Sequence, residues 1–175
     1  ARAVHTQSAR RFFPIVPVNC GALPDSLLES ELFGHEKGAF TGAQFRRKGK
    51  LEMADGGTLF LDEVGTIGQK TQVDLLRVLE SKEFHRVGGS QPVKVDFRVI
   101  CATNEDLEQL VAVGKFRQDL YYRINVFSIV APPLRERRGD IPLLAHHFRK
   151  KLSLQMDKHI TEISPEAMHK LIAHD

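Results

Sequence analysis

Two carboxylates directly after a short apolar run could carry phosphate chemistry. Leu59-Phe60-Leu61 is typical of a buried strand, and Asp62 and Glu63 stand at its carboxyl end. In open α/β sheets, ligands bind beyond the carboxyl ends of the strands. Asp62 is placed to hold Mg²⁺ through water, because that ion keeps part of its hydration shell, and Glu63 could polarise a water for attack on phosphorus. Acidic turns after strands are common, so the pair alone leaves a catalytic role and a plain turn both open.

Side chains with amide or hydroxyl groups follow two more predicted strands. Thr103 and Asn104 end the apolar run Val99-Ile100-Cys101-Ala102, and Asn19 follows the short strand predicted at Ile15 to Val18. An amide at the carboxyl end of a parallel strand can sense a phosphate or orient a water. Threonine and asparagine are equally suited to helix N-caps and turns, so this alternative also stays open for all three residues.

Arg117 and Arg123 lie six residues apart in a segment with a helical pattern. A guanidinium group is planar and permanently charged, so it can reach a γ-phosphate across a subunit boundary. The ordinary role of an arginine on a helix is a surface salt bridge. The spacing by itself does not decide between these two roles.

The hexapeptide Gly38-Ala39-Phe40-Thr41-Gly42-Ala43 has neither a helical nor a strand period and is predicted to be a loop. Gly38 and Gly42 allow the backbone to bend at both ends. Phe40 then becomes a large apolar side chain on a mobile tip, where it can contact a partner. The alternative is that Phe40 packs into its own domain, as most phenylalanines do.

Short apolar strands alternate with helices, which predicts an α/β fold with a parallel sheet and flanking helices. A loop is expected over 34–49 and a hairpin or protruding loop over 86–95, and everything from Asp140 onward is expected to be helical, as a second subdomain. We expect Asp25 or Ser26 to cap the second helix, and Val73, Leu76 and Leu79 to share one face of the third. Strands are predicted at 15–18, 58–61, 97–102 and 126–130, and helices at 1–11, 24–32, 69–81 and up to about 122.

The composition suits one domain, or one and a small piece of another. The 175 residues are 42% hydrophobic, enough to bury a core, and contain no apolar run of membrane-spanning length. The start does not resemble a signal peptide, so we expect a cytoplasmic protein without a membrane partner. Cys20 and Cys101 have no metal or redox spacing and are expected to be buried free thiols. The eight histidines show no metal-ligand spacing, and His146-His147 is expected to be a surface pair.

The charge balance gives no general argument for DNA binding. Lysine and arginine number 25 against 22 aspartates and glutamates, which is too small an excess to indicate nucleic-acid binding by the whole chain. The basic clusters are expected to be solvated faces. They are Arg46-Arg47-Lys48, Arg135 to Arg138, and Arg149-Lys150-Lys151.

The hexapeptide matches the GAFTGA loop of bacterial enhancer-binding proteins, the AAA+ ATPases that activate sigma-54 RNA polymerase, and the resemblance extends through nearly all 175 residues. It implies a P-loop NTPase-type α/β core over 1–134 and the start of a helical lid over 135–175. In that family residues 38–43 contact sigma-54, and Gly88-Gly89-Ser90-Gln91-Pro92 resembles a second protruding loop. The segment from Pro133 to Ile141 resembles the junction between core and lid.

The resemblance also assigns roles to the residues with candidate chemistry. Asp62 and Glu63 match the Walker B motif, so Asp62 is implied to hold Mg²⁺ and Glu63 to activate water. Thr103 and Asn104 match sensor I, with Asn104 near the nucleotide. Asn19 matches the asparagine that pairs with the catalytic glutamate and relays nucleotide state to the loop. The two arginines match fingers acting in trans on ATP, which are Arg117 and Arg123.

One family motif is not found in these residues. A P-loop needs Gly-x-x-x-x-Gly-Lys-Ser/Thr, and the two Gly-Lys pairs here, Gly49-Lys50 and Gly114-Lys115, do not satisfy it. In the family the P-loop lies just upstream of residues matching Ala1 to His5, and sensor II follows in the lid beyond the residues present here. We therefore expect an AAA+ domain truncated at both ends, without its first strand, and without ATPase activity as an isolated piece.

The resemblance implies a ring, a hexamer or heptamer, that hydrolyses ATP between subunits and remodels the sigma-54 closed promoter complex. DNA would be bound by a separate domain. Two other functions remain open from the residues. One is a nucleotide-independent interaction module, and the other is a different AAA+ remodeller with a pore or substrate loop, against which the letters of the hexapeptide argue.

Overall fold

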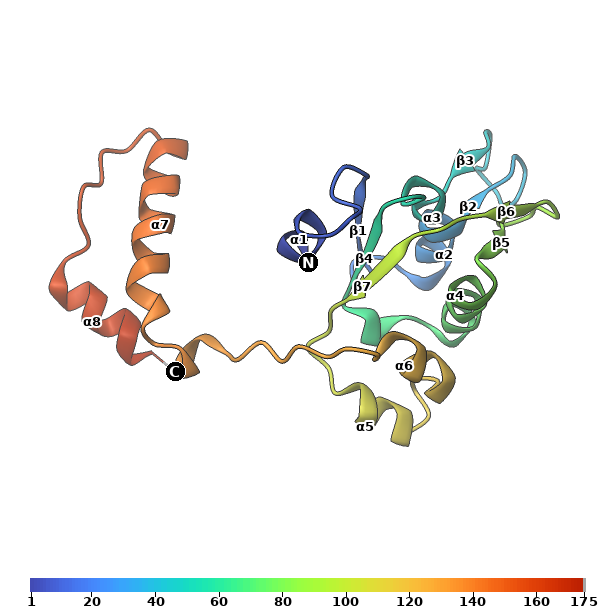
Figure 1. Cartoon of the computed structure of the whole chain (residues 1–175). Coiled ribbons are helices and arrows are strands. Elements are labelled where there is room, and N and C mark those ends of the chain that lie inside the picture. The colour runs from blue at the N-terminus through green and yellow to red at the C-terminus, as the bar shows by residue number, and fades with distance from the viewer. Residues whose placement is uncertain (175) are drawn as a thin grey trace. The chain divides into compact units, whose positions relative to one another are not determined.

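The computed structural model describes residues 1–174, which fall into two compact units, one of residues 1–127 and one that begins at Ser128 (Figure 1). The first unit is built on a three-stranded sheet in the order β1-β4-β7, comprising β1 (Ile15–Asn19), β4 (Thr58–Asp62) and β7 (Arg98–Cys101). Both pairings are parallel, so the predicted α/β fold with a parallel sheet is confirmed.

One face of this sheet forms the core of the first unit. Successive strand residues point to opposite faces, and Val16 and Val18 of β1 lie on the same buried face as Leu59 and Leu61 of β4. These side chains pack with residues of α2 (Asp25–Phe33), α3 (Lys50–Met53) and α4 (Gln69–Ser81) in one apolar cluster. Pro17 is tolerated in β1 because this strand lies at the edge of the sheet in the described residues.

Two details of the predicted helices were wrong. No side chain caps α2, because its N-cap position is Pro24 rather than Asp25 or Ser26. The fully buried face of α4 is formed by Thr71, Gln72, Leu75, Val78 and Leu79, whereas Val73 and Leu76 are only half-buried. The bounds of α4, residues 69–81, agree with the prediction.

The segment after β7 forms two helices and not one. Asp106 caps α5 (Leu107–Ala112) by accepting a hydrogen bond from the Gln109 N–H at 3.1 Å, and α6 (Gln118–Ile124) follows. Gly114, with φ of 73°, adopts a left-handed conformation that ends the first of them.

Four further predictions, on the length, burial or presence of helices, strands and a loop, were also wrong. The first helix, α1 (Arg2–Thr6), is shorter than 1–11. The strand predicted at 97–102 was expected to be buried, but β7 covers only Arg98–Cys101 and is at most half-buried, with a neighbouring strand on one side only in the described residues. Residues 126–130 are exposed and form no strand, since nothing in the described part of the chain pairs with them. The predicted loop 34–49 contains a short ribbon of β2 (Gly34–His35) and β3 (Arg47–Lys48).

The predicted hairpin is confirmed as β5 (Glu83–His85) paired with β6 (Pro92–Lys94). It lies beside the β2–β3 ribbon (Figure 1), to which it is joined by a bridge between His35 and Val87. Two backbone hydrogen bonds of 3.0 Å, from Val87 N–H to Gly34 C=O and from Glu36 N–H to Val87 C=O, complete the junction.

From Asp140 onward the second unit forms two of the expected helices, but the expectation that this whole segment is helical was wrong, because residues 156–164 between them are not helical. It contains a 3₁₀ turn, η2 (Leu134–Glu136), then α7 (Asp140–Gln155) and α8 (Pro165–Ala173). Ser164 caps α8 by accepting from the Ala167 N–H at 3.2 Å, with Pro165 in the first turn. Asp175, the end of the predicted lid, lies outside the described residues. Within residues 1–174 no helix has both the length and the apolar character that a membrane span requires.

Candidate functional site

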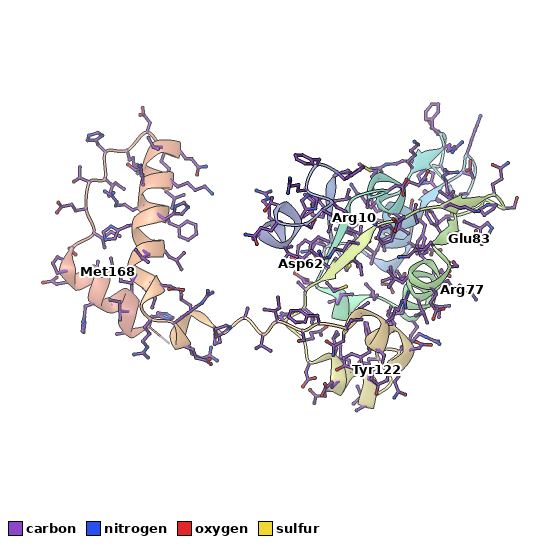
Figure 2. All side chains as sticks on the ribbon, viewed as in Figure 1. Arg10, Asp62, Arg77, Glu83, Tyr122 and Met168 are labelled. Atoms are coloured by element: carbon purple, nitrogen blue, oxygen red, sulfur yellow. The ribbon has the colours of Figure 1, made fainter. Side chains whose placement is uncertain are left out.

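The register of the sheet brings the predicted polar groups together at the edge formed by the carboxyl ends of its strands. Asn19 of β1 is paired with Asp62 of β4, so both strands end at the same level (Figure 2 labels Asp62). The chain after β7 joins this edge, because the Val64 N–H donates to the Ala102 C=O at 3.0 Å. Three strand ends therefore meet here, as expected for ligand sites of parallel sheets.

Asn19 and Glu63 are in direct contact. The Asn19 Nδ2 donates to Glu63 Oε1 at 3.3 Å, while its Oδ1 accepts from the Gly21 and Ala22 N–H groups at 2.9 and 3.1 Å. These two backbone bonds hold the Asn19 amide so that its NH₂ faces Glu63. Because residue 21 is glycine, no side chain there competes with Glu63 Oε2 for space.

Glu63 has an unusual backbone conformation. Its φ of 54° and ψ of 44° place it in the left-handed region, which costs free energy for a residue with a side chain. The turn into the 3₁₀ helix η1 (Val64–Thr66) is held by hydrogen bonds to the Glu63 C=O from the Thr66 N–H at 3.1 Å and the Thr66 hydroxyl at 2.8 Å. This turn directs the carboxylate of Glu63 toward Asn19.

Asp62 is half-buried, and its Oδ1 accepts from the Glu63 N–H at 3.1 Å. Residues 1–174 contain no cluster of three or more His, Cys, Asp or Glu side chains that could enclose a metal ion. A single carboxylate at a strand end fits Mg²⁺, which is commonly held by one or two carboxylates, waters and phosphate oxygens rather than by a protein cage.

Burial of Cys20, immediately after Asn19, favours the neutral thiol over the thiolate. Its burial raises the pKa of the thiol to about 12, and the charges of Asp62 and Glu63 contribute to the increase. Burial likewise raises the pKa of Cys101 to about 12. Both cysteines are free thiols, as predicted, although Cys101 is only half-buried.

Thr103 and Asn104 follow β7 at this end of the sheet, and within residues 1–174 no hydrogen bond joins either of them to Asp62 or Glu63. The Thr103 hydroxyl accepts from the Glu105 N–H at 3.0 Å, so the turn-forming role considered for it is present in the structure. Asn104 is exposed. A function of either residue in sensing nucleotide stays a prediction.

Both predicted finger arginines bond to groups away from the two carboxylates. Arg117 forms a bidentate ion pair with Asp119, with distances of 3.0 Å from Nε and 2.6 Å from Nη2, and Arg123 Nη2 donates to the Leu79 C=O at 2.8 Å. The hydrogen bond and charge of Arg117 lower the pKa of Asp119. Within residues 1–174, neither arginine bonds to Asp62 or Glu63, so the chain by itself does not bring all of the predicted catalytic groups together.

Gln72 positions the start of α6, which the sequence analysis missed. Its side chain is buried, donates to Ile67 C=O at 2.8 Å and Lys115 C=O at 3.0 Å, and accepts from the Arg117 N–H at 2.8 Å. The one feature of the sequence that could have indicated this role is the position of Gln72 on the apolar side of a predicted helix.

The hexapeptide 38–43 is a compact turn at the tip of the β2–β3 ribbon. Gly38 and Gly42 have φ of 80° and 99°, conformations that favour glycine, and the Gly38 N–H donates to Ala43 C=O at 2.8 Å. Phe40 is 43% exposed and packs edge-on against His35, with ring centroids 5.0 Å apart, instead of entering the core. The tip thus presents Phe40 partly to solvent, while Ala43 is buried.

A buried arginine fixes the base of this loop, and sequence analysis missed it. Arg86 is 7% exposed and contacts Glu52 of α3 at 2.8 and 2.6 Å and Glu36 of the loop at 2.9 Å. Burial alone would raise the pKa of Glu52, but the hydrogen bonds and charge of Arg86 outweigh it and lower that pKa. Charged residues are seldom buried, so no pattern in the sequence indicated this contact.

Comparison with known proteins gives consistent matches. Residues 1–130 match the family described as Sigma-54 interaction domain, and residues 135–175 match the AAA+ ATPase lid domain. The Nif-specific regulatory protein of Herbaspirillum seropedicae is 60% identical over 168 residues, 96% of this chain and 31% of that protein. The regulatory protein AtoC of Escherichia coli (strain K12) is 56% identical over 173 residues, 99% of this chain and 38% of that protein.

A solved structure of NtrX from Brucella abortus aligns with a TM-score of 0.93 at 43% identity, covering 99% of this chain and 39% of that one. NtrX in complex with ATP aligns with a TM-score of 0.89 at 42% identity, over 99% of this chain and 37% of that one. The chain therefore spans 31% to 39% of the length of these three relatives.

The ion pairs of Arg86 generate a stability prediction. Arg86→Ala should lower the free energy of unfolding by about 3–5 kcal/mol, because it leaves the nearly buried carboxylate of Glu52 without its partner. Arg77→Ala is the matched control, since Arg77 is exposed and lies 3.7 Å from Asp74, and it should change the free energy by at most about 0.5 kcal/mol. Urea unfolding measures both.

The same contact sets the pH dependence. The pKa of Glu52 is lowered from its ordinary value of 4.5, so its contribution to stability is present above that value and is lost as the pH falls through the lowered pKa. The difference between the wild type and Arg86→Ala should therefore shrink in acid. Equal losses of stability in the Arg86 and Arg77 variants at neutral pH would contradict the prediction.

Proposed function

This chain belongs to the sigma-54 interaction domain family and continues into an AAA+ ATPase lid, and we propose that it is the central ATPase domain of a bacterial sigma-54-dependent transcriptional activator. Its proposed function is to couple ATP hydrolysis to remodelling of the sigma-54 RNA polymerase closed complex. The observation that carries this proposal is the loop 38–43, which has the GAFTGA sequence and a partly exposed Phe40 at the tip of a ribbon anchored to the ATPase core.

The hydrolytic site is proposed at the carboxyl ends of β1, β4 and β7. Glu63 accepts a proton from the attacking water, and Asn19 holds the carboxylate of Glu63 through the 3.3 Å hydrogen bond. Asp62 holds Mg²⁺ through water, and that ion neutralises phosphate charge when bound. Thr103 and Asn104 face the γ-phosphate end. Nucleotide binding is supported by the solved NtrX complexes with ADP and with ATP.

Arg117 and Arg123 are proposed to act on the nucleotide of a neighbouring subunit in a hexameric or heptameric ring. Their separation from Asp62 and Glu63 within one chain supports this assignment, because a site completed in trans needs fingers that do not reach the carboxylates of their own subunit. On this proposal Arg117 exchanges its ion pair with Asp119 for the γ-phosphate charge when the ring assembles.

The remaining assignments concern the whole protein. We propose that its P-loop precedes residue 1, so that a polypeptide of these 175 residues alone does not hydrolyse ATP. The core is proposed as 1–134 and the lid as 135–175. DNA recognition is assigned to a separate domain, and the protein to the cytoplasm.

Coupling to the loop is proposed to run through α2. Asn19 ends β1, α2 spans Asp25–Phe33, and Gly34 begins the β2–β3 ribbon with no intervening linker. A change in the contact between Asn19 and Glu63 on hydrolysis would displace the start of this helix, and the helix would transmit the displacement to the stem of loop 38–43.

Glu63→Gln in the whole protein should retain ATP binding and lose about 10²–10⁴-fold in turnover, because glutamine keeps the shape of the side chain and lacks a basic oxygen. Glu80→Gln is the control: Glu80 is an exposed carboxylate on α4 and its change should leave turnover unaltered. A phosphate-release assay and nucleotide titration provide the two readouts. Turnover of the Glu63 variant near that of the wild type would exclude Glu63 as the base.

Phe40→Ala and Thr41→Ala should retain ATP hydrolysis and the melting temperature of the wild type but lose open-complex formation at a sigma-54 promoter. Phe40 is outside the core, and interface energy concentrates in a few aromatic contacts, to which the Thr41 hydroxyl can add a hydrogen bond. Phe33→Ala is the control for a core phenylalanine, and should cost about 3–5 kcal/mol of stability. A comparable loss of stability in Phe40→Ala would make Phe40 a core residue and refute the partner contact.

A further inference from the structure

The loop 38–43 has a second exposed phenylalanine at its base. Phe45 is 77% exposed, and the three residues that follow it are Arg46, Arg47 and Lys48. The sequence alone indicated a solvated basic face here. An aromatic ring left in water within that face is the observation that the solvated-face interpretation does not explain.

The 3.6 Å ion pair between Glu36 and Arg46 brings the two sides of the loop stem together, just beyond the short ladder of β2 and β3. Lys37 follows Glu36 on one side of the stem, and Phe45 precedes Arg46 on the other. The side chains of Lys37 and Phe45 are both exposed, so a cation from the opposite side of the stem adds to the basic run that follows the ring.

The charge of this segment is strongly positive. Residues 34–48 contain four lysines and arginines and one acidic residue, Glu36. Arg47 lies 2.8 Å from Glu31 and Arg46 lies 3.6 Å from Glu36, but the two arginine side chains are 63% and 55% exposed. Ion pairs this exposed contribute little to stability in water, so the guanidinium groups can exchange them for other anions.

We propose that this aromatic–basic face, made of Lys37, Phe45, Arg46, Arg47 and Lys48, binds single-stranded DNA. A nucleobase stacks on the Phe45 ring and the cations contact the backbone phosphates, which is the combination that single-strand binding proteins use. Duplex DNA fits less well, because its bases are already stacked on each other. A protein partner also fits less well, because charged residues are depleted from the centres of protein interfaces, and four of the five residues of this face are cations.

The position of this face suggests how binding of single-stranded DNA would contribute to the proposed function. Phe45 lies five residues from Phe40, on the same loop that is proposed to contact sigma-54. A strand exposed as the promoter opens would then meet the base of the loop while the tip holds sigma-54. This placement rests on the proposed function, whereas the DNA contact itself does not.

The test is fluorescence anisotropy of 5′-fluorescein-labelled (dT)₂₀ titrated with the purified protein, without ATP or sigma-54. Phe45→Ala should weaken binding by about 5- to 100-fold, and Phe45→Tyr should restore it, because tyrosine also stacks on bases. Phe12→Ala is the matched control. Phe12 is 84% exposed and lies beside a cation too, with Arg11 4.7 Å from its ring, yet its change should leave binding unaltered.

The charges have a separate readout. A Lys37→Gln, Arg47→Gln double variant should reduce the slope of log affinity against log salt by about 0.7 for each phosphate that the protein no longer neutralises. Wild-type affinity for (dT)₂₀ in Phe45→Ala overturns the proposal and assigns the face to a protein partner. An equal loss in Phe12→Ala, or an equal loss of duplex binding in Phe45→Ala, also overturns it. Failure of the Phe40 variants to separate hydrolysis from activation would refute the proposed function and leave these results standing.

Discussion

The parallel pairing of β1 with β4 is the constraint on which the candidate site depends. It aligns Asn19 with Asp62, and the Cys20 N–H donates to the Asp62 C=O at 2.9 Å at the end of the ladder. A register shifted by one residue would turn every side chain of β1 to the other face. The buried Val16 and Val18 prevent such a shift, so the apolar core on one face of the sheet fixes the distance between an amide and a carboxylate beyond its edge.

The loop 38–43 depends on a second fixed point, the buried guanidinium of Arg86. Its contacts join residues 34 and 50 positions away along the chain, so the hairpin, α3 and the loop stem form one polar junction. A buried ion pair of this kind adds little net stability but is costly to break, so it selects one arrangement of the stem. Gly88 of the hairpin lies against Ala39, where a side chain would be too close. The stem of the loop is therefore anchored at one polar junction, while Phe40 at its tip and Phe45 at its base are exposed and can meet partners.

The sequence predicted the elements whose evidence is local. The three sheet strands and α4 have clear apolar periodicity, and the carboxylates of Asp62 and Glu63 stand at a strand end that could be located from the letters alone. The prediction of a strand at 126–130 was wrong, because a strand needs a neighbouring strand to pair with and the apolar pattern of a sequence carries no information about neighbours. The roles of Arg86 and Gln72 depend on contacts between distant segments, and the pairing of Arg117 with Asp119 depends on rotamers. The contact of Asn19 with Glu63 was predicted from the family resemblance, and the register of the sheet gives the physical reason for it.

On the proposed function, the Asn19–Glu63 contact carries nucleotide state to loop 38–43 through α2. Hydrogen exchange of residues 34–48, measured on the whole protein with ADP and with a non-hydrolysable ATP analogue, tests it most directly. We predict that exchange differs between the two nucleotides in the wild type, and that the difference disappears in Asn19→Ala while both nucleotides still bind. The same nucleotide-dependent difference in Asn19→Ala would contradict the account.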